Sequence, residues 1–395
     1  MTGKTSNGRK GRFDVIVVGA GPAGSTAARH CALAGLKTLV LEKQTMPRYK
    51  PCAGGFSLAA ARELDFELPE GLIERKCRGL RVHYRTIERE VRLPETTALM
   101  VIRSSFDAHL ARKAEEAGAA LRDHTPCTGV SVEREGVSVE TDGEVFTTDV
   151  VIGADGFFSR VRRSLHLRFE PDEIRTCALA EVPLTPDEID RRFGDLVLIH
   201  YGYLSKGYAW IFPKKNHLSV GIGGACNRSG EVPEALRSFL SCHGLPTDVP
   251  IRGCFIPVSQ WRTDLFFDRV LLTGDAAGLV DSFSGEGIKY AITSGRLAAQ
   301  TVIQAHGRGD FSTGLLQEYQ SRLMATDGRE LKRSNHVTDR LFSYENLLLG
   351  AVVWNVEALE RYLMIVRGDS SFSEYMSWLK RRLPRYLLKR VLHFR

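Results

Sequence analysis

The segment at 13–24, Phe-Asp-Val-Ile-Val-Val-Gly-Ala-Gly-Pro-Ala-Gly, constrains this chain more than any other. Its apolar first half predicts a buried strand, and the Gly-x-Gly-x-x-Gly that follows predicts a tight turn into a helix over about 23–34. Gly19 allows the turn, Gly21 lets the backbone approach a pyrophosphate, and Gly24 lets helix and strand pack closely.

A second predicted strand, at 37–41, ends at Glu42, eighteen residues past Gly24. A carboxylate at this place can accept hydrogen bonds from both ribose hydroxyls of an adenosine. The preceding helix, from Ala23, offers its N-terminal N–H groups and the positive end of its dipole to the phosphates. The unit therefore predicts a bound dinucleotide. Because a carboxylate disfavours a 2′-phosphate, the candidates are FAD or NAD rather than NADP.

The charge of the chain is concentrated at its two ends. At 395 residues the chain is long enough for two or three folding units. Of the net charge of +7, residues 1–12 contribute +4 and residues 374–395 contribute +6, which leaves −3 for the rest. This distribution argues against a nucleic-acid-binding body, so no nucleic acid partner is expected.

No apolar run approaches the length of a membrane span, and the first residues are polar and basic. We therefore expect a cytoplasmic protein that touches a membrane, at most, from that side. The eight cysteines include no Cys-x-x-Cys pair and no His-linked metal spacing, which predicts reduced thiols and no metal site.

The order of patterns predicts an α/β fold in which a Rossmann-type nucleotide-binding domain is interrupted by a mostly antiparallel β-sheet domain for the substrate. A helical C-terminal region follows, and a disordered basic leader precedes the first strand. The predicted boundaries are 1–12 for the leader, 13–65, 98–168 and 264–310 for the nucleotide-binding domain, 66–97 and 169–263 for the inserted sheet, and 311–395 for the helical region.

Two later segments indicate that the dinucleotide is FAD. Arg103 stands at a predicted strand end before a helix, where a guanidinium can reach a pyrophosphate. Asp275, in a second strand-to-helix turn, can accept from a ribityl hydroxyl, and the helix start at Gly287 and Ile288 can place N–H donors beside a flavin pyrimidine. Taken singly, Arg103 can be a surface residue and Asp275 an Asx cap of a tight turn.

These motifs, with Gly-Ala-Asp-Gly at 153–156, resemble flavoproteins of the para-hydroxybenzoate hydroxylase type over about 13–306. Two stretches narrow the resemblance. Lys-Pro-Cys-Ala-Gly-Gly at 50–55 is similar to the Lys-Pro-Cys-Gly-Gly loop of geranylgeranyl reductases, and Tyr-Ala-Trp-Ile-Phe-Pro at 208–213 is similar to their Tyr-x-Trp-x-Phe-Pro strand. The resemblance implies an enzyme that uses FAD to saturate double bonds of a geranylgeranyl or polyprenyl chain.

The same resemblance places further residues at the site. In the glycine-rich loop, Cys52, Ala53 and Gly55 are expected beside the flavin, where Cys52 either supplies a proton or serves close packing. Along the aromatic strand Tyr208, Trp210 and Phe212 alternate and share one face, which lines either a substrate cavity or an ordinary sheet core.

Two departures from the superfamily pattern bear on the reaction. Gly278 stands where hydroxylases usually carry His, which favours a reductase, and Ser282 stands where reductases often carry Pro. We find no isolated Lys in a setting typical of a halogenase relay. The alternatives are a flavin-dependent monooxygenase or halogenase of the same superfamily, and a non-catalytic flavoprotein or lipid-binding module.

The expected substrate is a prenylated lipid or quinone, and the expected electron donor is NAD(P)H or a reduced carrier protein. The basic, aromatic segment at 374–395 either packs on the body or lies on an anionic membrane surface. Pro384 is expected to divide this segment into two short helices.

Overall fold

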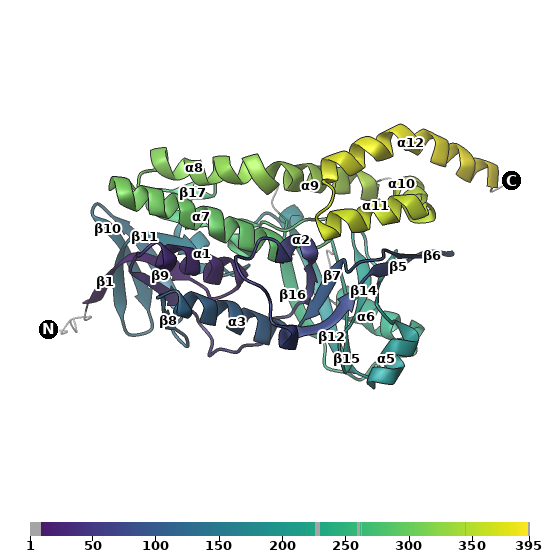
Figure 1. The fold of residues 1–395 in the computed structure, drawn as a ribbon, viewed down its shortest axis with the longest axis horizontal. Helices are drawn as coiled ribbons and strands as arrows, with labels where there is room; N and C mark the ends of the chain where they lie inside the picture. Colours follow the sequence, from purple (N-terminus) through teal and green to yellow (C-terminus); the bar gives the residue numbers. More distant parts are fainter. Residues whose placement is uncertain (1–8, 226–229, 259–260, 262, 344, 394–395) are drawn as a thin grey trace.

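The fold is organised around a parallel sheet with the strand of the first glycine motif at its centre (Figure 1). It is seen in a computed structural model that describes residues 9–225, 230–258, 261, 263–343 and 345–393. Val15, Ile16 and Val17 are fully buried because the sheet is covered on both faces. Within the described residues, the parallel strands are, in spatial order, β18 (Val270–Leu272), β11 (Val145–Gly153), β1 (Arg9–Val18), β2 (Thr38–Leu41) and β8 (Ala120–Arg122).

The first strand begins earlier than predicted. Residues 9–12 were expected in a disordered leader, but they form the start of β1, with Arg9 beside Val145. The guanidinium of Arg12 pairs with the carboxylate of Asp149 on β11. Residues 1–8 of the predicted leader lie outside the described residues.

Helices pack closely on the central sheet. A Cβ placed on Gly295 of α7 would lie 2.2 Å from the carbonyl oxygen of Ala23 in α1, so the two helices cross with their backbones in contact. The elements that complete this domain are α1 (Pro22–Leu33), α3 (Arg103–Glu116), α4 (Arg160–Ser164), α7 (Ile288–Arg308), β9 (Cys127–Glu133), β10 (Gly136–Thr141) and β17 (Phe266–Phe267).

The inserted sheet is almost wholly antiparallel, as predicted. Its exception is the parallel pair β5 and β13, which joins the two sequence segments that build it. One face packs on α5 (Pro186–Arg192) and α6 (Glu231–Cys242), and the other faces the nucleotide-binding domain and the C-terminal helices. The described strands run in the order β16 (Arg252–Pro257), β12 (Ile174–Pro183), β15 (His217–Gly224), β14 (Tyr208–Pro213), β13 (Leu196–Tyr201), β5 (Gly79–Tyr84) and β6 (Ile87–Arg92).

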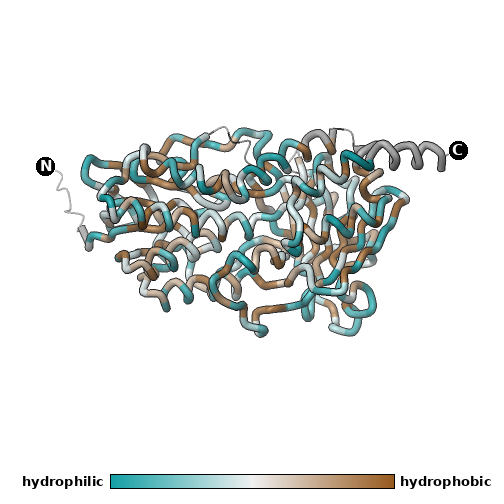
Figure 2. The backbone as a smooth tube through the Cα atoms, turned by 45° about the horizontal axis from the view of Figure 1, so that its top comes forward, coloured by the Kyte–Doolittle hydropathy of each residue, from teal (hydrophilic) through white to brown (hydrophobic). Residues whose placement is uncertain are grey.

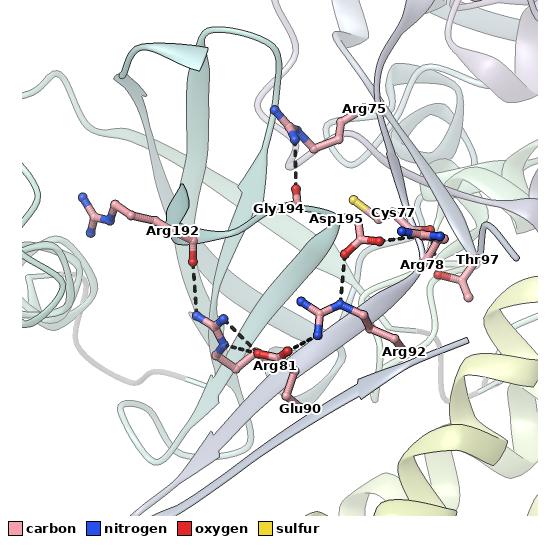
Figure 3. Close-up of polar contacts among 10 residues, drawn as sticks. All are labelled: Arg75, Cys77, Arg78, Arg81, Glu90, Arg92, Thr97, Arg192, Gly194 and Asp195. Atoms are coloured by element: carbon pink, nitrogen blue, oxygen red, sulfur yellow. Dashed lines mark hydrogen bonds and ion pairs between the residues drawn. The ribbon is translucent and has the colours of Figure 1, made fainter. Parts of the chain in front are cut away.

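A network of arginines and carboxylates connects these two segments (Figure 3). The carboxylate of Asp195, just before β13, accepts from Arg78 at 2.6 Å and from Arg92 at 3.1 Å. Glu90 on β6 accepts from Arg81 at 2.9 Å. Charge-assisted hydrogen bonds of this kind are stronger than neutral ones, so they reinforce the parallel pairing of β5 with β13.

A small third sheet lies between the two large ones. It contains β3 (Gly55–Ser57), which leads into α2 (Leu58–Ala61), and β7 (Ala98–Val101) pairs on one side with β3 and on the other with β4 (Ile73–Cys77). Residues 66–97 were assigned to the inserted sheet, but of their strands only β5 and β6 join it. β4 pairs instead with the free edge of β7.

Helices form the C-terminal region, as predicted: α8 (Thr313–Leu323), α9 (Arg329–Ser343), α10 (Glu345–Trp354), α11 (Val356–Arg367) and α12 (Phe372–His393). The expected break at Pro384 is wrong, because α12 continues through it and bends along its length (Figure 1). Proline removes one hydrogen bond of a helix, but this loss does not end α12. In the described part of the chain no helix is long and apolar enough to cross a membrane, and apolar segments are short and dispersed (Figure 2).

Candidate functional site

The first glycine turn is closely packed at two of its glycines and open at the third. Gly19 has φ +102°, and a Cβ there would lie 2.4 Å from the carbonyl oxygen of Ala154; a Cβ on Gly24 would lie 1.8 Å from that of Gly19. These two glycines are therefore required by packing. Gly21 differs, because the nearest atom to its Cβ position is a guanidinium nitrogen of Arg48 at 3.6 Å. The open side of the turn thus lies at Gly21, where the sequence predicts the pyrophosphate.

The predicted ribose-binding carboxylate is buried beside this turn. Glu42 is 3% exposed, and its carboxylate accepts from the backbone N–H of Ala20 at 2.9 Å. The guanidinium of Arg48 lies 3.4 Å from the same carboxylate. Glu42 is therefore fixed against the glycine turn, at the position where an adenosine ribose would reach it.

Arg103 lies in the same cluster but is already paired. Its Nε and Nη2 donate to both oxygens of Asp107, at 2.8 and 2.9 Å, and Arg48 donates to Asp107 at 2.9 Å. The thiol of Cys52 lies near this guanidinium. The chain Glu42–Arg48–Asp107–Arg103 thus links the glycine turn to the Cys52 loop. The contact of Arg103 with a pyrophosphate stays a prediction. Asp107 already orients the guanidinium that would make this contact.

The second turn brings the predicted flavin-binding residues together. A Cβ on Gly287 would lie 3.7 Å from a carboxylate oxygen of Asp275, so the helix start at Gly287 and Ile288 adjoins this carboxylate. Lys50, from the loop before Cys52, lies 3.9 Å from the other oxygen of Asp275. Gly278 ends the turn with φ +76°, a conformation that favours glycine.

A buried lysine holds the Cys52 loop in place. Lys214 is 2% exposed and donates to the carbonyl oxygens of Ala53, Gly54 and Val101, at 2.6, 3.3 and 3.1 Å. Burial lowers the pKa of its ammonium to about 8. A role for Lys214 was not predicted from the sequence. In the structure it is a buried lysine whose ammonium points at backbone carbonyls.

The aromatic residues of β14 share one face, as predicted. Tyr208, Trp210 and Phe212 belong to one apolar cluster with Ala53. Tyr208 donates its hydroxyl to the carbonyl oxygen of Ser284, and a Cβ on Gly55 would lie 2.7 Å from the ring of Phe212. The aromatic face therefore contacts both the Cys52 loop and the segment before α7.

An apolar cavity opens beside Tyr208. Its volume is about 50 Å³, and it lies between the sheet strands β5, β13 and β14 and the helices α10 to α12. Phe283 and Ser284 line it next to Tyr208, so one side of the cavity is formed by the segment that leads to Gly287. Of the predicted substrate residues, only Tyr208 is part of its wall; Trp210 and Phe212 lie further along the strand.

Four residues of the site were not predicted from the sequence: Arg48, Asp107, Lys214 and Glu286. Arg103 and Asp107 are four residues apart on a helix, a spacing that indicates an ion pair and was available in the sequence. Glu286 is a partly buried carboxyl whose pKa is raised by burial, beside the aromatic face. Neither its burial nor that of Lys214 has a local sequence pattern.

The open position at Gly21 generates a prediction. Replacing Gly21 with Val should weaken FAD binding at least about tenfold, because the side chain would take the place of the pyrophosphate. Gly21 has extended backbone that Val adopts readily, and its Cβ meets no backbone atom, so the apoprotein should fold. Flavin absorbance after gel filtration and the melting temperature of apoprotein are the measurements; normal flavin content would contradict the assignment.

Lys214 generates a prediction about pH. Its pKa is about 8 in the fold against about 10.4 in an unfolded chain, so between these values the unfolded chain binds more protons and stability rises with pH. From pH 7.0 to 9.5 the wild type should gain about 2 kcal/mol in free energy of unfolding relative to Lys214→Met. Denaturant titrations check this, with exposed Lys215→Met as control. Parallel pH profiles of wild type and Lys214→Met would refute it.

Comparison with known proteins agrees with this geometry. Residues 12–216 match the family described as FAD binding domain. Digeranylgeranylglycerophospholipid reductase 1 of Methanopyrus kandleri is 34% identical over 337 residues, which cover 78% of this chain and 85% of that relative. The structure is similar to a geranylgeranyl bacteriochlorophyll reductase-like protein of Thermoplasma acidophilum, with TM-score 0.80 and 26% identity over 93% of this chain and 98% of that one.

A flavin-dependent halogenase is a more distant neighbour, with TM-score 0.64 and 21% identity over 82% of this chain and 64% of that one, and it shares the fold alone. The glycine turn and the loop at 50–55 thus occur in a chain that is similar over most of its length to a named reductase. This chain belongs to the geranylgeranyl reductase family of FAD-dependent oxidoreductases.

Proposed function

We propose that this enzyme reduces carbon–carbon double bonds of a geranylgeranyl or polyprenyl chain carried by a lipid, a quinone or a related isoprenoid. The observation that carries the proposal is the apolar cavity beside Tyr208. The name of the relative from Methanopyrus kandleri, a digeranylgeranylglycerophospholipid reductase, supports the same class of substrate.

The walls of the cavity suit a hydrocarbon chain. The sheet supplies Leu80, Val82 and Ile199, and the opposite wall is formed by aliphatic side chains of α10 and α11: Leu349, Val352, Val353 and Leu359. Prenyl chains offer no hydrogen-bonding groups, so an apolar wall binds them by the hydrophobic effect alone. The cavity reaches Ser284, and the Gly287 turn follows three residues later, which would bring a bound chain toward the predicted flavin.

The reaction needs a hydride and a proton. Reduced FAD supplies the hydride when it is bound. An isolated alkene accepts hydride poorly unless a proton is delivered to the neighbouring carbon, so a side chain must hold that proton in a dry site. We propose Cys52 as this donor, because its thiol lies in the loop that Lys214 holds, next to Arg103. The ring of Tyr208 would face the positive charge that develops on the alkene.

The alternatives remain testable. A monooxygenase or halogenase would use oxygen, and a flavoprotein without catalysis would keep FAD as a structural group. The engagement of Lys214 with three carbonyls argues against a lysine relay at this position. We propose NAD(P)H or a reduced carrier protein as the electron source.

Reduction should be visible in the mass of the lipid. Reduced enzyme incubated with a geranylgeranyl lipid under ¹⁸O₂ should give products heavier by two hydrogens per saturated bond and free of the oxygen label. Labelled product would indicate a monooxygenase. In the same assay Val353→Trp, which fills the cavity, should lower activity on a long chain more than on a short one, whereas Val356→Trp, at an exposed position, should not.

Cys52 can be tested as the proton donor. Cys52→Ser keeps the size of the side chain but replaces the thiol by a much weaker acid, so turnover should fall about 100-fold while FAD content stays normal. Cys242→Ser, at an exposed thiol, is the control. Unchanged turnover in Cys52→Ser would leave Glu286 as the candidate.

We further propose that the end of the chain contacts anionic membranes. The first half of α12 packs on the body through Tyr375, Trp378 and Leu379, so only residues 383–395, with four Lys or Arg, are proposed for this contact. Each basic residue near such a surface contributes about 1 kcal/mol. Truncation after Arg382 should abolish salt-sensitive co-sedimentation with anionic vesicles and leave stability unchanged. Equal binding by the truncated chain would exclude this contact.

A further inference from the structure

Two cysteines face each other on neighbouring strands of the inserted sheet. Cys177 on β12 lies directly opposite Cys254 on β16 in the antiparallel register. Both are free thiols and belong to the apolar cluster of Trp210 and Ala53, on the side of the sheet that faces the Cys52 loop. The pair thus forms part of the wall between the two domains, and neither thiol has a role in the proposed reduction.

The positions of these cysteines are compatible with a disulfide. Directly opposite residues of an antiparallel pair have Cα atoms about 4.5 or 5.5 Å apart, depending on the type of pair. Disulfides span Cα separations of about 4.4 to 6.8 Å, so either type can be bridged without moving the strands. Both side chains belong to the same apolar cluster, so they lie on the same face of the sheet.

The two thiols differ in access and in acidity. Cys254 is partly exposed on β16, the edge strand of the sheet. The neighbouring Cys177 thiol and the Lys50 ammonium lower the pKa of Cys254 in spite of its burial, which favours the nucleophilic thiolate. Cys177 is 2% exposed, and its sulfur is enclosed by β15, where a Cβ on Gly223 would lie 2.4 Å from it. This asymmetry is typical of an attacking and a resolving thiol.

We propose that Cys177 and Cys254 form a reversible dithiol–disulfide pair that exchanges with low-molecular-weight disulfides. The Cys254 thiolate attacks one sulfur of the reagent disulfide, forms a mixed disulfide and releases one reagent thiol. The Cys177 thiol, after losing its proton, then attacks the Cys254 sulfur and releases the second. The protein loses two protons and two electrons, and one reagent disulfide gains them and becomes two thiols.

Oxidation of the pair would change the wall against which the Cys52 loop packs. Cys254 and Ala53 lie in the same cluster, so a bridge between β12 and β16 would fix the edge strand beside this loop. The proposal does not rest on prenyl reduction, since the exchange uses neither the cavity nor the lipid. The flavoprotein can therefore be tested without substrate.

The test uses purified FAD-loaded Cys242→Ser protein, which lacks the one thiol that is exposed among the described cysteines and would react directly with the reagent. After equilibration with mixtures of oxidised and reduced glutathione, free thiols are alkylated and the protein is analysed by intact mass and peptide mapping. Compared with the fully reduced protein, we expect two fewer alkylated thiols, a single cross-linked pair of peptides containing Cys177 and Cys254, and full reversal by dithiothreitol. Cys31, Cys77 and Cys127 are buried internal references and should stay reduced.

Two variants identify the roles of the thiols. Cys177→Ser should accumulate about tenfold more glutathione adduct on Cys254 than its parent, because the resolving thiol is missing, and Cys254→Ser should form neither adduct nor bridge. A stable adduct on Cys254 of the parent, a bridge to Cys52 instead, or no reaction at any glutathione ratio would each overturn the proposal. Flavin absorbance and circular dichroism show that the variants are folded.

Discussion

The relation between the two domains depends on one buried ammonium. Lys214 follows directly after β14 of the inserted sheet. Its three hydrogen bonds reach a loop and a strand in segments assigned to the nucleotide-binding domain, at Ala53, Gly54 and Val101. A buried charge is costly unless its hydrogen bonds are satisfied, and these carbonyls satisfy all three donors of the ammonium. Because the same strand carries Tyr208 and Phe212, Lys214 also fixes the distance between the aromatic face and the Cys52 loop.

Local patterns predicted the parts of the site that are local in the chain. The glycine turn at 19–24 and Glu42 belong to one strand–helix–strand unit, and their roles follow from spacing alone. Lys214 and Arg48 could not be predicted in this way. The ammonium of Lys214 binds a carbonyl 161 residues away, and Arg48 pairs with Asp107, 59 residues away. Contacts of this kind depend on how the sheets pack, and no periodicity in the sequence encodes that.

The glycine at position 278 has two explanations, one from the reaction and one from the backbone. Glycine in place of the usual histidine favours a reductase by resemblance, and the relatives of the chain agree with that conclusion. In the structure Gly278 also ends a tight turn with φ +76°, where a side chain would be strained. The backbone alone therefore accounts for glycine here, so this residue identifies the turn more directly than it identifies the reaction.

The parallel pairing of β5 with β13 has a consequence for synthesis of the protein. Arg78 and its partner Asp195 are 117 residues apart, so the hairpin of β5 and β6 leaves the ribosome long before its neighbour exists. Pairings between distant segments form slowly, and an unpaired strand edge is prone to aggregation in the interval. The nucleotide-binding domain is completed later still during synthesis, because β18 and α7 come from residues 270–308. The inserted sheet can therefore be completed only after residue 257 has been made, and the nucleotide-binding sheet only after residue 272.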